Sequence, residues 1–268
     1  MSRNLYIVPY DFTPVTDKAV EYALHIGKYV DTEIRILHLA ASNEKAKFKD
    51  KLLEDKKNKL TIPPGVEVTT AVKVGDIFTD IGKIAKEEKA QLVIMGTHGI
   101  RGLQNIFGSF AMKVITSTEC AFLIVQKNTE FAEISSVAVP IDLTKESLQI
   151  VNIAGDMANI LKANINVLAE KQSDQILNTR LQNRLGIVRK QYEERGIESN
   201  IHLVSRGGRY GRKIMQFVKK NNIGMVALAY HSESIFPQFD SFAQNLITNK
   251  QSLPVLIINS KLASTLYY

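Results

Sequence analysis

The chain contains two copies of one pattern, displaced by about half of its 268 residues. Asn4–Thr13 reads NLYIVPYDFT and Ser135–Thr144 reads SSVAVPIDLT, so an apolar run precedes Pro-x-Asp-apolar-Thr in both, 131 residues apart. Further on, LVIMGTH at Leu92–His98 matches MVALAYH at Met225–His231 at an offset of 133. A repeat of this length predicts a duplicated domain. The chain is therefore expected to form two related domains rather than one.

Within each half, short apolar runs alternate with helix-length segments, and the domains are expected at residues 1–130 and 131–268. Runs such as IRILHL and QLVIMG are continuously apolar, as parallel strands buried on both faces require. Five β-α units per half predict an α/β fold of two tandem, doubly wound, five-stranded parallel sheets. The expected strands lie near 4–8, 34–39, 66–73, 91–96, 121–126, 136–140, 164–169, 199–204, 224–229 and 254–259. The expected helices lie near 16–30, 44–60, 76–89, 108–118, 145–161, 172–195, 208–221 and 239–250.

Charge and composition narrow the class of protein. The net charge is +7, and residues 135–268 contribute +6 of it. This excess suits solubility or an anionic partner, but no nucleic-acid-binding module accompanies it, so nucleic acid is not an expected partner. No apolar run is long enough to cross a bilayer, which excludes a membrane partner from the prediction. With one cysteine and no signal-peptide pattern at its start, the sequence predicts a soluble, cytoplasmic protein.

A glycine-rich tract in the first half predicts a ligand site. Met95–Ile115 reads MGTHGIRGLQNIFGSFAMKVI, with four glycines within thirteen positions. Glycines allow a backbone to approach a ligand closely, and open parallel sheets bind ligands beyond the carboxyl ends of their strands. Asp11 follows the first strand at that same edge, and Gly108-Ser109 at a helix start would direct amides and a hydroxyl toward a phosphate. Neither G-x-x-x-x-G-K-[ST] nor G-x-G-x-x-G occurs, which argues against P-loop and dinucleotide sites.

The motifs VPYDFT, ILHLA, VGD, IMGTHG and the later GS make residues 4–126 resemble a universal stress protein domain, and residues 135–259 resemble a diverged second copy. The resemblance implies a Rossmann-like fold of the adenine nucleotide alpha hydrolase-like type. It also implies, for one branch of that family, ATP binding through G-x2-G-x9-G-(S/T), with Mg²⁺ as an accompanying ion. Eight residues rather than nine separate the second and third glycines here, so a retained site and a lost site both stay open. By this resemblance the nucleotide-binding residues are Asp11, Leu39, Met95, Gly96, Gly99, Gly108, Ser109 and Phe110.

The second copy lacks the glycine tract. Ala229–Ser241 reads AYHSESIFPQFDS, in which Tyr230 and Phe236-Pro237 replace small and flexible residues. These side chains would fill the space through which a triphosphate approaches the backbone. Asp142 and Ser241 survive as relics or structural caps. We therefore expect only the first half to bind nucleotide.

No residue stands out as catalytic. His98 recurs as His231 in the half without glycines, which favours a structural role. His38 is expected to be a satisfied core residue, and Cys120 a buried structural thiol. Arg206–Arg212, reading RGGRYGR, offers an anion site or simply a basic strand-to-helix turn. Slow ATP turnover is compatible with a bound Mg–ATP, but no residue is committed to it.

These observations favour an ATP-binding stress protein with a regulatory role, whose occupancy changes its conformation or partners. One alternative is a nucleotide-independent interaction scaffold, and a weaker one is an ATP-using enzyme. The resemblance also implies pairing through the last strands, Phe122–Gln126 and Val255–Asn259. That pairing produces either an intramolecular pseudo-dimer or a homodimer.

Overall fold

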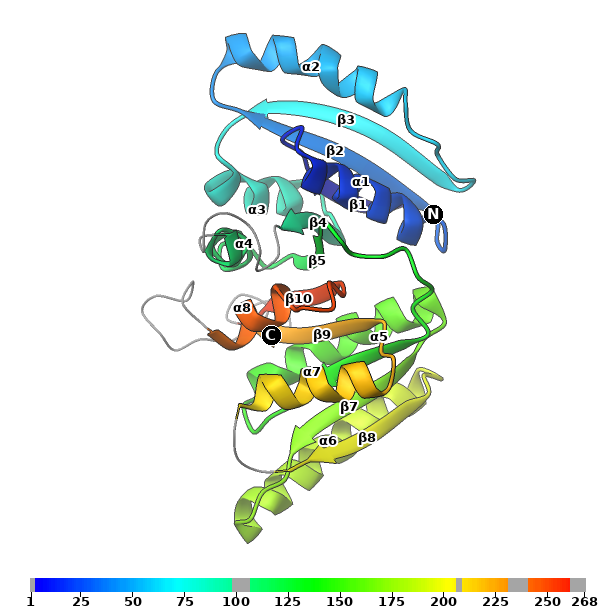
Figure 1. Cartoon of the computed structure of the whole chain (residues 1–268), viewed down its shortest axis with the longest axis vertical. Coiled ribbons are helices and arrows are strands. Elements are labelled where there is room, and N and C mark those ends of the chain that lie inside the picture. Colours follow the sequence, from blue (N-terminus) through cyan, green and yellow to red (C-terminus); the bar gives the residue numbers. More distant parts are fainter. Residues whose placement is uncertain (1–2, 98–106, 206–208, 231–240, 261–268) are drawn as a thin grey trace.

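The computed structural model describes residues 3–97, 107–205, 209–230 and 241–260. Its ten strands form one sheet in the order β3-β2-β1-β4-β5-β10-β9-β6-β7-β8, which runs the length of the molecule (Figure 1). The strands of each half are parallel to one another, and the second half repeats the strand order of the first in reverse. The predicted fold class, two tandem doubly wound parallel-sheet units, is confirmed.

Strands and helices alternate along the chain, as predicted. The strands are β1 (Asn4–Pro9), β2 (Thr32–Ala40), β3 (Val66–Val74), β4 (Leu92–Thr97), β5 (Ala121–Gln126), β6 (Ser136–Pro140), β7 (Asn164–Glu170), β8 (Ser199–Val204), β9 (Met225–Tyr230) and β10 (Val255–Asn259). The helices are α1 (Pro14–Gly27), α2 (Asn43–Lys57), α3 (Ile77–Glu87), α4 (Phe107–Ile115), the 3₁₀ turn η1 (Glu146–Gln149), α5 (Ile150–Leu161), α6 (Gln175–Glu194), α7 (Tyr210–Lys220) and α8 (Ser241–Ile247).

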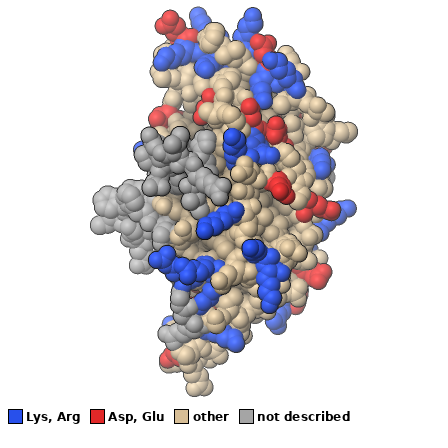
Figure 2. All heavy atoms as spheres, viewed as in Figure 1, with Lys and Arg blue, Asp and Glu red and all other residues tan. Residues whose placement is uncertain are grey.

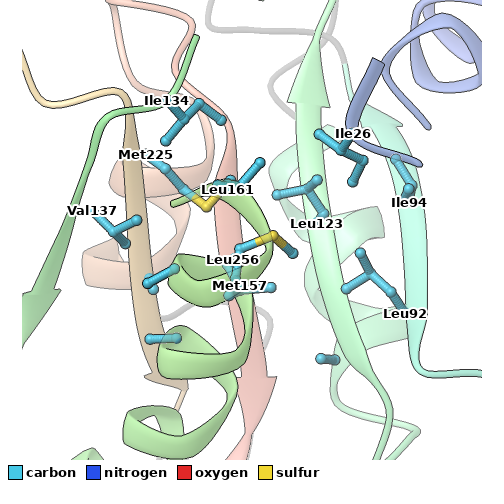
Figure 3. Packing of buried hydrophobic residues seen from close by; sticks show 14 of the residues in the cluster. Ile26, Leu92, Ile94, Leu123, Ile134, Val137, Met157, Leu161, Met225 and Leu256 are labelled. Atoms are coloured by element: carbon cyan, nitrogen blue, oxygen red, sulfur yellow. The ribbon is translucent and has the colours of Figure 1, made fainter. Parts of the chain in front are cut away.

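Each face of the sheet carries one core that extends across both halves. Along β1, Tyr6 and Val8 point to one face and Leu5 and Ile7 to the other, because side chains of a strand alternate. The first face packs against α1, α2, α5 and α6, and the second against α3, α4, α7 and α8. Figure 3 shows the first core where the halves meet, with side chains from both halves gathered beside Leu123 and Leu256. Burial on both faces explains the continuously apolar strands.

The halves join through β5 and β10, which pair antiparallel with Leu123 opposite Leu256. The ends of the two strands make matching hydrogen bonds to the opposite half. The side-chain amide of Gln126 donates to the carbonyl of Asn249 at 2.9 Å, and that of Asn259 donates to the carbonyl of Thr116 at 3.0 Å. The two donors, Gln126 and Asn259, are 133 residues apart, and so are the two acceptors, Thr116 and Asn249. A pseudo-two-fold axis at this junction therefore relates the two halves of one chain. The pairing of β5 with β10 is the one that the resemblance implied.

The Gln126 amide provides a test of this junction. It also donates to the carbonyl of Ile247 at 3.1 Å, and the side chain is buried. Gln126→Ala removes the donor from two carbonyls, and we expect it to lower the free energy of unfolding by about 1–3 kcal/mol. Urea unfolding followed by circular dichroism measures this. A loss well below 0.5 kcal/mol would show that water replaces the amide at little cost.

One expected helix is divided. The sequence predicts a single helix at 145–161, but the chain forms η1 first and α5 begins only at Ile150. In the first half, Pro14 opens α1 at the first helical position, where its fixed φ favours a helix. Lys145 holds the corresponding place before η1 and has no such preorganisation.

On the face shown in Figure 2, Lys and Arg side chains gather over the second half, where Figure 1 places α7. The sequence of this helix contains Arg212, Lys213, Lys219 and Lys220. The distribution matches the +6 charge of residues 135–268. Across the residues that the structure describes, no helix combines the length and the apolar character that a bilayer crossing requires.

Candidate functional site

The first half holds a pocket of about 410 Å³ at the carboxyl ends of its strands. The ends of β1, β2 and β4 form its floor, and β1 and β4 are the neighbours between which the winding of the sheet reverses. Four of the predicted binding residues line it together: Asp11, Leu39, Met95 and Gly96. Its apolar wall adds Leu37, Ile77 and Phe78, and its polar lining adds His38, Asp76 and Thr97. The last three were not predicted as lining residues.

The carboxylate of Asp11 organises the turn from β1 into α1. Its Oδ1 accepts hydrogen bonds from the Thr13 amide at 3.0 Å, the Thr13 hydroxyl at 2.6 Å and the Thr16 hydroxyl at 2.9 Å. All three of these hydrogen bonds from described residues are accepted by Oδ1. The side chain of Asp11 is exposed and lines the pocket. Asp11 therefore has a structural role in its own turn, and these hydrogen bonds do not involve its Oδ2.

An aromatic cluster beside this turn fixes the pocket wall. Phe12 has φ = 68°, the left-handed region that bulky residues rarely adopt. Its ring makes edge contacts with Tyr10 at 5.0 Å and with His38 at 5.2 Å, and Lys49 lies over it at 4.3 Å. Nδ1 of His38 donates to the Tyr10 carbonyl at 2.7 Å. The predicted satisfied state of His38 thus has a geometric basis, and the strained Phe12 marks a site held rigid by its surroundings.

A second anchor ties the end of β1 to α1 and α2. The Tyr10 hydroxyl donates to Asp17 Oδ1 at 2.5 Å, and Lys56 approaches the same oxygen at 2.7 Å. Burial acts to raise the pKa of Asp17, but hydrogen bonds from Lys56 and Tyr10 outweigh it and hold that pKa below its usual value. The carboxylate therefore remains charged, and the bridge keeps α2 against the pocket edge.

The packing of α1 on β4 requires a glycine at position 96. A Cβ built there would lie 2.3 Å from the Val15 carbonyl oxygen and 2.9 Å from its carbon. The glycines of this tract were predicted to allow close approach by a ligand, and at Gly96 the first turn of α1 also approaches closely. Gly96 lines the pocket because β4 and α1 converge there.

Three of the remaining predicted residues belong to α4, which borders the pocket. Ala111 in α4 lines the cavity, and α4 begins at Phe107. With a rise of about 1.5 Å per residue, Gly108, Ser109 and Phe110 occupy the helix turn immediately before it; the structure describes their backbone only. Gly99 lies outside the described residues.

In the second half, Tyr210 stands at the place that corresponds to Ile77 of the pocket, 133 residues earlier. Its hydroxyl donates to the Leu168 carbonyl at 2.7 Å, at the carboxyl end of β7, and its ring stacks on Phe242 with centroids 6.0 Å apart. Burial raises the pKa of Tyr210, and the carboxylates of Asp142 and Glu170 act in the same direction. The hydroxyl thus remains a donor and occupies the sheet edge beside Asp142, an arrangement that the sequence did not predict.

Asp142 keeps the turn that Asp11 makes. Its Oδ1 accepts from the Thr144 amide at 2.7 Å and from the Thr144 hydroxyl at 2.5 Å. The motif Pro-x-Asp-apolar-Thr therefore has a structural function in both halves. Asp142 is a structural cap, one of the two roles considered for it; the side chain of Ser241 lies outside the description.

Ala229 replaces Gly96 in the second half, and the helix opposite it changes too. η1 packs against β9 where α1 packs against β4. A Cβ at Ala229 requires more room than Gly96 does, and the chain opposite begins as a 3₁₀ turn instead of an α-helix.

Several other predicted features fall elsewhere. Cys120 is half-buried with its Sγ 3.5 Å from the Ala90 carbonyl, and burial raises its pKa to about 12. His98, His231, Phe236-Pro237 and residues 206–208 of the basic turn lie outside the described residues. Within the described parts of the chain, no three His, Cys, Asp or Glu side chains are grouped as metal ligands.

Comparisons with known proteins agree with this architecture. The model of the universal stress protein family matches residues 6–126. The universal stress protein MJ0531 of Methanocaldococcus jannaschii is 30% identical over 144 residues, which cover 47% of this chain and 85% of that protein. The universal stress protein YxiE of Bacillus subtilis is 29% identical over 147 residues, 46% of this chain and 99% of that protein.

A solved structure matches nearly the whole chain. A universal stress protein from Archaeoglobus fulgidus superposes with a TM-score of 0.74 at 17% identity, over 97% of this chain and 100% of that one. At this identity the match shows the fold, and it extends through both halves. The sequence matches carry the assignment: the chain belongs to the universal stress protein family.

Proposed function

We propose that the first half binds ATP, and that the protein is a regulatory stress protein whose nucleotide occupancy changes its conformation or partners. The observation that carries the proposal is the pocket itself. Asp11, Leu39 and Met95 come from the ends of three different strands, yet the fold brings them to one cavity of about 410 Å³. This volume lies in the range of small-molecule sites.

The chemistry of the lining suits a nucleoside. Leu39, Ile77 and Met95 provide apolar surface for a base. Oδ2 of Asp11 provides a charged acceptor for ribose hydroxyls, because Oδ1 is already used by the turn. Asp76 is held in place as the N-cap of α3, where its carboxylate accepts from the Phe78 amide at 2.8 Å. The two polar ends of the pocket are thus preorganised.

The phosphates would lie toward the start of α4. Backbone amides at a helix N-terminus favour an anion, and Gly108 and Ser109 are in the first turn of this helix. Gly99 completes the set by resemblance. Mg²⁺ would neutralise part of the phosphate charge there. None of these residues is proposed to act in catalysis.

One nucleotide per chain is the expected stoichiometry, since Tyr210 fills the corresponding edge of the second half. Equilibrium binding of a labelled ATP analogue with Mg²⁺ measures it. Ala41 is exposed and lines the pocket, so Ala41→Trp should abolish binding by filling the cavity. Lys51→Trp, exposed on α2 away from the lining, should leave binding unchanged.

Two equal sites per chain would contradict the assignment to the first half. A chain that binds no adenylate, and that releases none on mass spectrometry of fresh protein, would fit the nucleotide-independent scaffold. Phosphate release at a steady rate would favour the ATP-using enzyme.

A further inference from the structure

A second, larger cavity lies between the two halves. It is a groove of about 620 Å³ with a mainly apolar lining, at the amino ends of β1, β4 and β5. The first half contributes Tyr6, Leu92 and Cys120, and the second contributes Met157 of α5 and Leu256 of β10. Leu92, Met157 and Leu256 are seen from close by in Figure 3. The groove is separate from the nucleotide pocket, with which it shares no lining residue.

The pseudo-two-fold axis relates this groove to a site on the opposite side of the junction. That site is occupied by segment 127–135 of the chain, which follows β5. Phe131 packs against Tyr22 and His25 with ring centroids 6.0 and 5.7 Å apart, and the His25 ring reaches the Ala132 carbonyl at 3.4 Å. Ile134 is buried so closely on Gly224 that a Cβ there would lie 3.2 Å from its Cα.

The hydroxyl of Thr129 adds a polar attachment, donating to the Ser252 carbonyl at 2.6 Å. Together these contacts identify four residues that hold the segment: Tyr22, His25, Gly224 and Ser252. Their counterparts across the axis, at the repeat offsets of 131 and 133, are Ile153, Asp156, Gln91 and Glu119. All four counterparts line the groove. The groove is therefore the pseudo-symmetric counterpart of the site that segment 127–135 occupies.

The end of β10 leads toward this groove as the end of β5 leads into segment 127–135. Asn259 ends β10 as Gln126 ends β5, with matching hydrogen bonds, and Ile258 lines the groove. Beyond Ser260 the sequence continues with Lys261–Tyr268, KLASTLYY, which has four large apolar or aromatic side chains among eight residues.

We propose that residues 261–268 dock in the groove and hold the first half against α5, as segment 127–135 holds the second half against α1. Eight extended residues reach up to about 27 Å, enough to follow a groove of this volume. Its apolar walls favour the leucine and tyrosine side chains. A second copy of the chain could also occupy the groove, and the experiment below distinguishes that copy from residues 261–268 of the same chain.

The lone thiol reports on the groove, because Cys120 lines it and is the chain's one cysteine. The experiment measures the rate of Cys120 alkylation by N-ethylmaleimide at one pH in the native, full-length protein. The double variant Leu266→Asp/Tyr267→Asp is expected to react about tenfold faster, since a segment docked with an equilibrium constant of about ten leaves the groove open about a tenth of the time. A synthetic peptide of residues 260–268 should slow the double variant again.

Ile153→Arg places a charge on the groove wall and should also accelerate the reaction, while making the protein insensitive to the peptide. Asn159→Arg, an exposed position on the same helix, is the matched control and should react as the unmodified chain does. Equal rates in the double variant and the unmodified chain would overturn the proposal. So would protection that is lost on dilution, because a second copy would then be the occupant.

Discussion

Gly96→Ala is expected to lower the free energy of unfolding by about 3 kcal/mol, at the upper end of the usual cost of overpacking. The added methyl group would lie 2.3 Å from the carbonyl oxygen of Val15. That neighbour is backbone in the first turn of α1 and cannot rotate away. Either α1 or the end of β4 must shift, and both line the pocket that we propose for the nucleotide. Urea unfolding gives the stability change, and nucleotide titration should show weaker binding in the same variant.

Gly186→Ala is the control for this substitution. Gly186 is exposed within α6, and a Cβ there meets no atom within 4 Å. Alanine favours a helix over glycine by about 1 kcal/mol, so this variant should be more stable than the unmodified chain. If Gly96→Ala were as stable as the parent, the close packing of α1 on β4 would not be what requires glycine.

Periodicity was sufficient to predict the fold. The apolar runs that alternate with helix-length segments located all ten strands. The inner strands gave the clearest signal, because a parallel strand buried on both faces has no polar side, whereas the edge strands β3 and β8 are only partly buried. The 131- and 133-residue offsets then implied equivalent halves. The second offset also aligns Gln126 with Asn259, but their matching hydrogen bonds were not predicted and need the folded structure.

The candidate site was predictable only in part. Asp11, Leu39 and Met95 were found by resemblance, and the structure brings them to one pocket. The contact of Gly96 with Val15 was missed, because it joins two elements whose spacing no local pattern encodes. Tyr210 was missed for the same reason, since its effect depends on which strand ends its ring covers.

The two halves share the residues that form their turns and differ in residues at the ends of their strands. Asp11 and Asp142 cap the same turn, so the conserved geometry of that motif within the chain does not by itself indicate a ligand. The halves differ where Tyr210 replaces Ile77 and Ala229 replaces Gly96. Two side-chain replacements on a sheet of the same strand order thus distinguish the strand ends of the second half from those of the first.

Asp11→Asn is expected to weaken ATP binding by about 10–100-fold while changing stability by less than about 1 kcal/mol. The asparagine Oδ1 can accept the same bonds from Thr13 and Thr16, which preserves the turn. At Oδ2, however, an amide donor replaces a charged acceptor for the ribose, a loss worth about 1.5–3 kcal/mol. Asp142→Asn makes the same change in the second half and should leave the affinity unaltered. Calorimetric titration of both variants decides the matter: equal affinities would mean that Asp11, like Asp142, serves the turn alone.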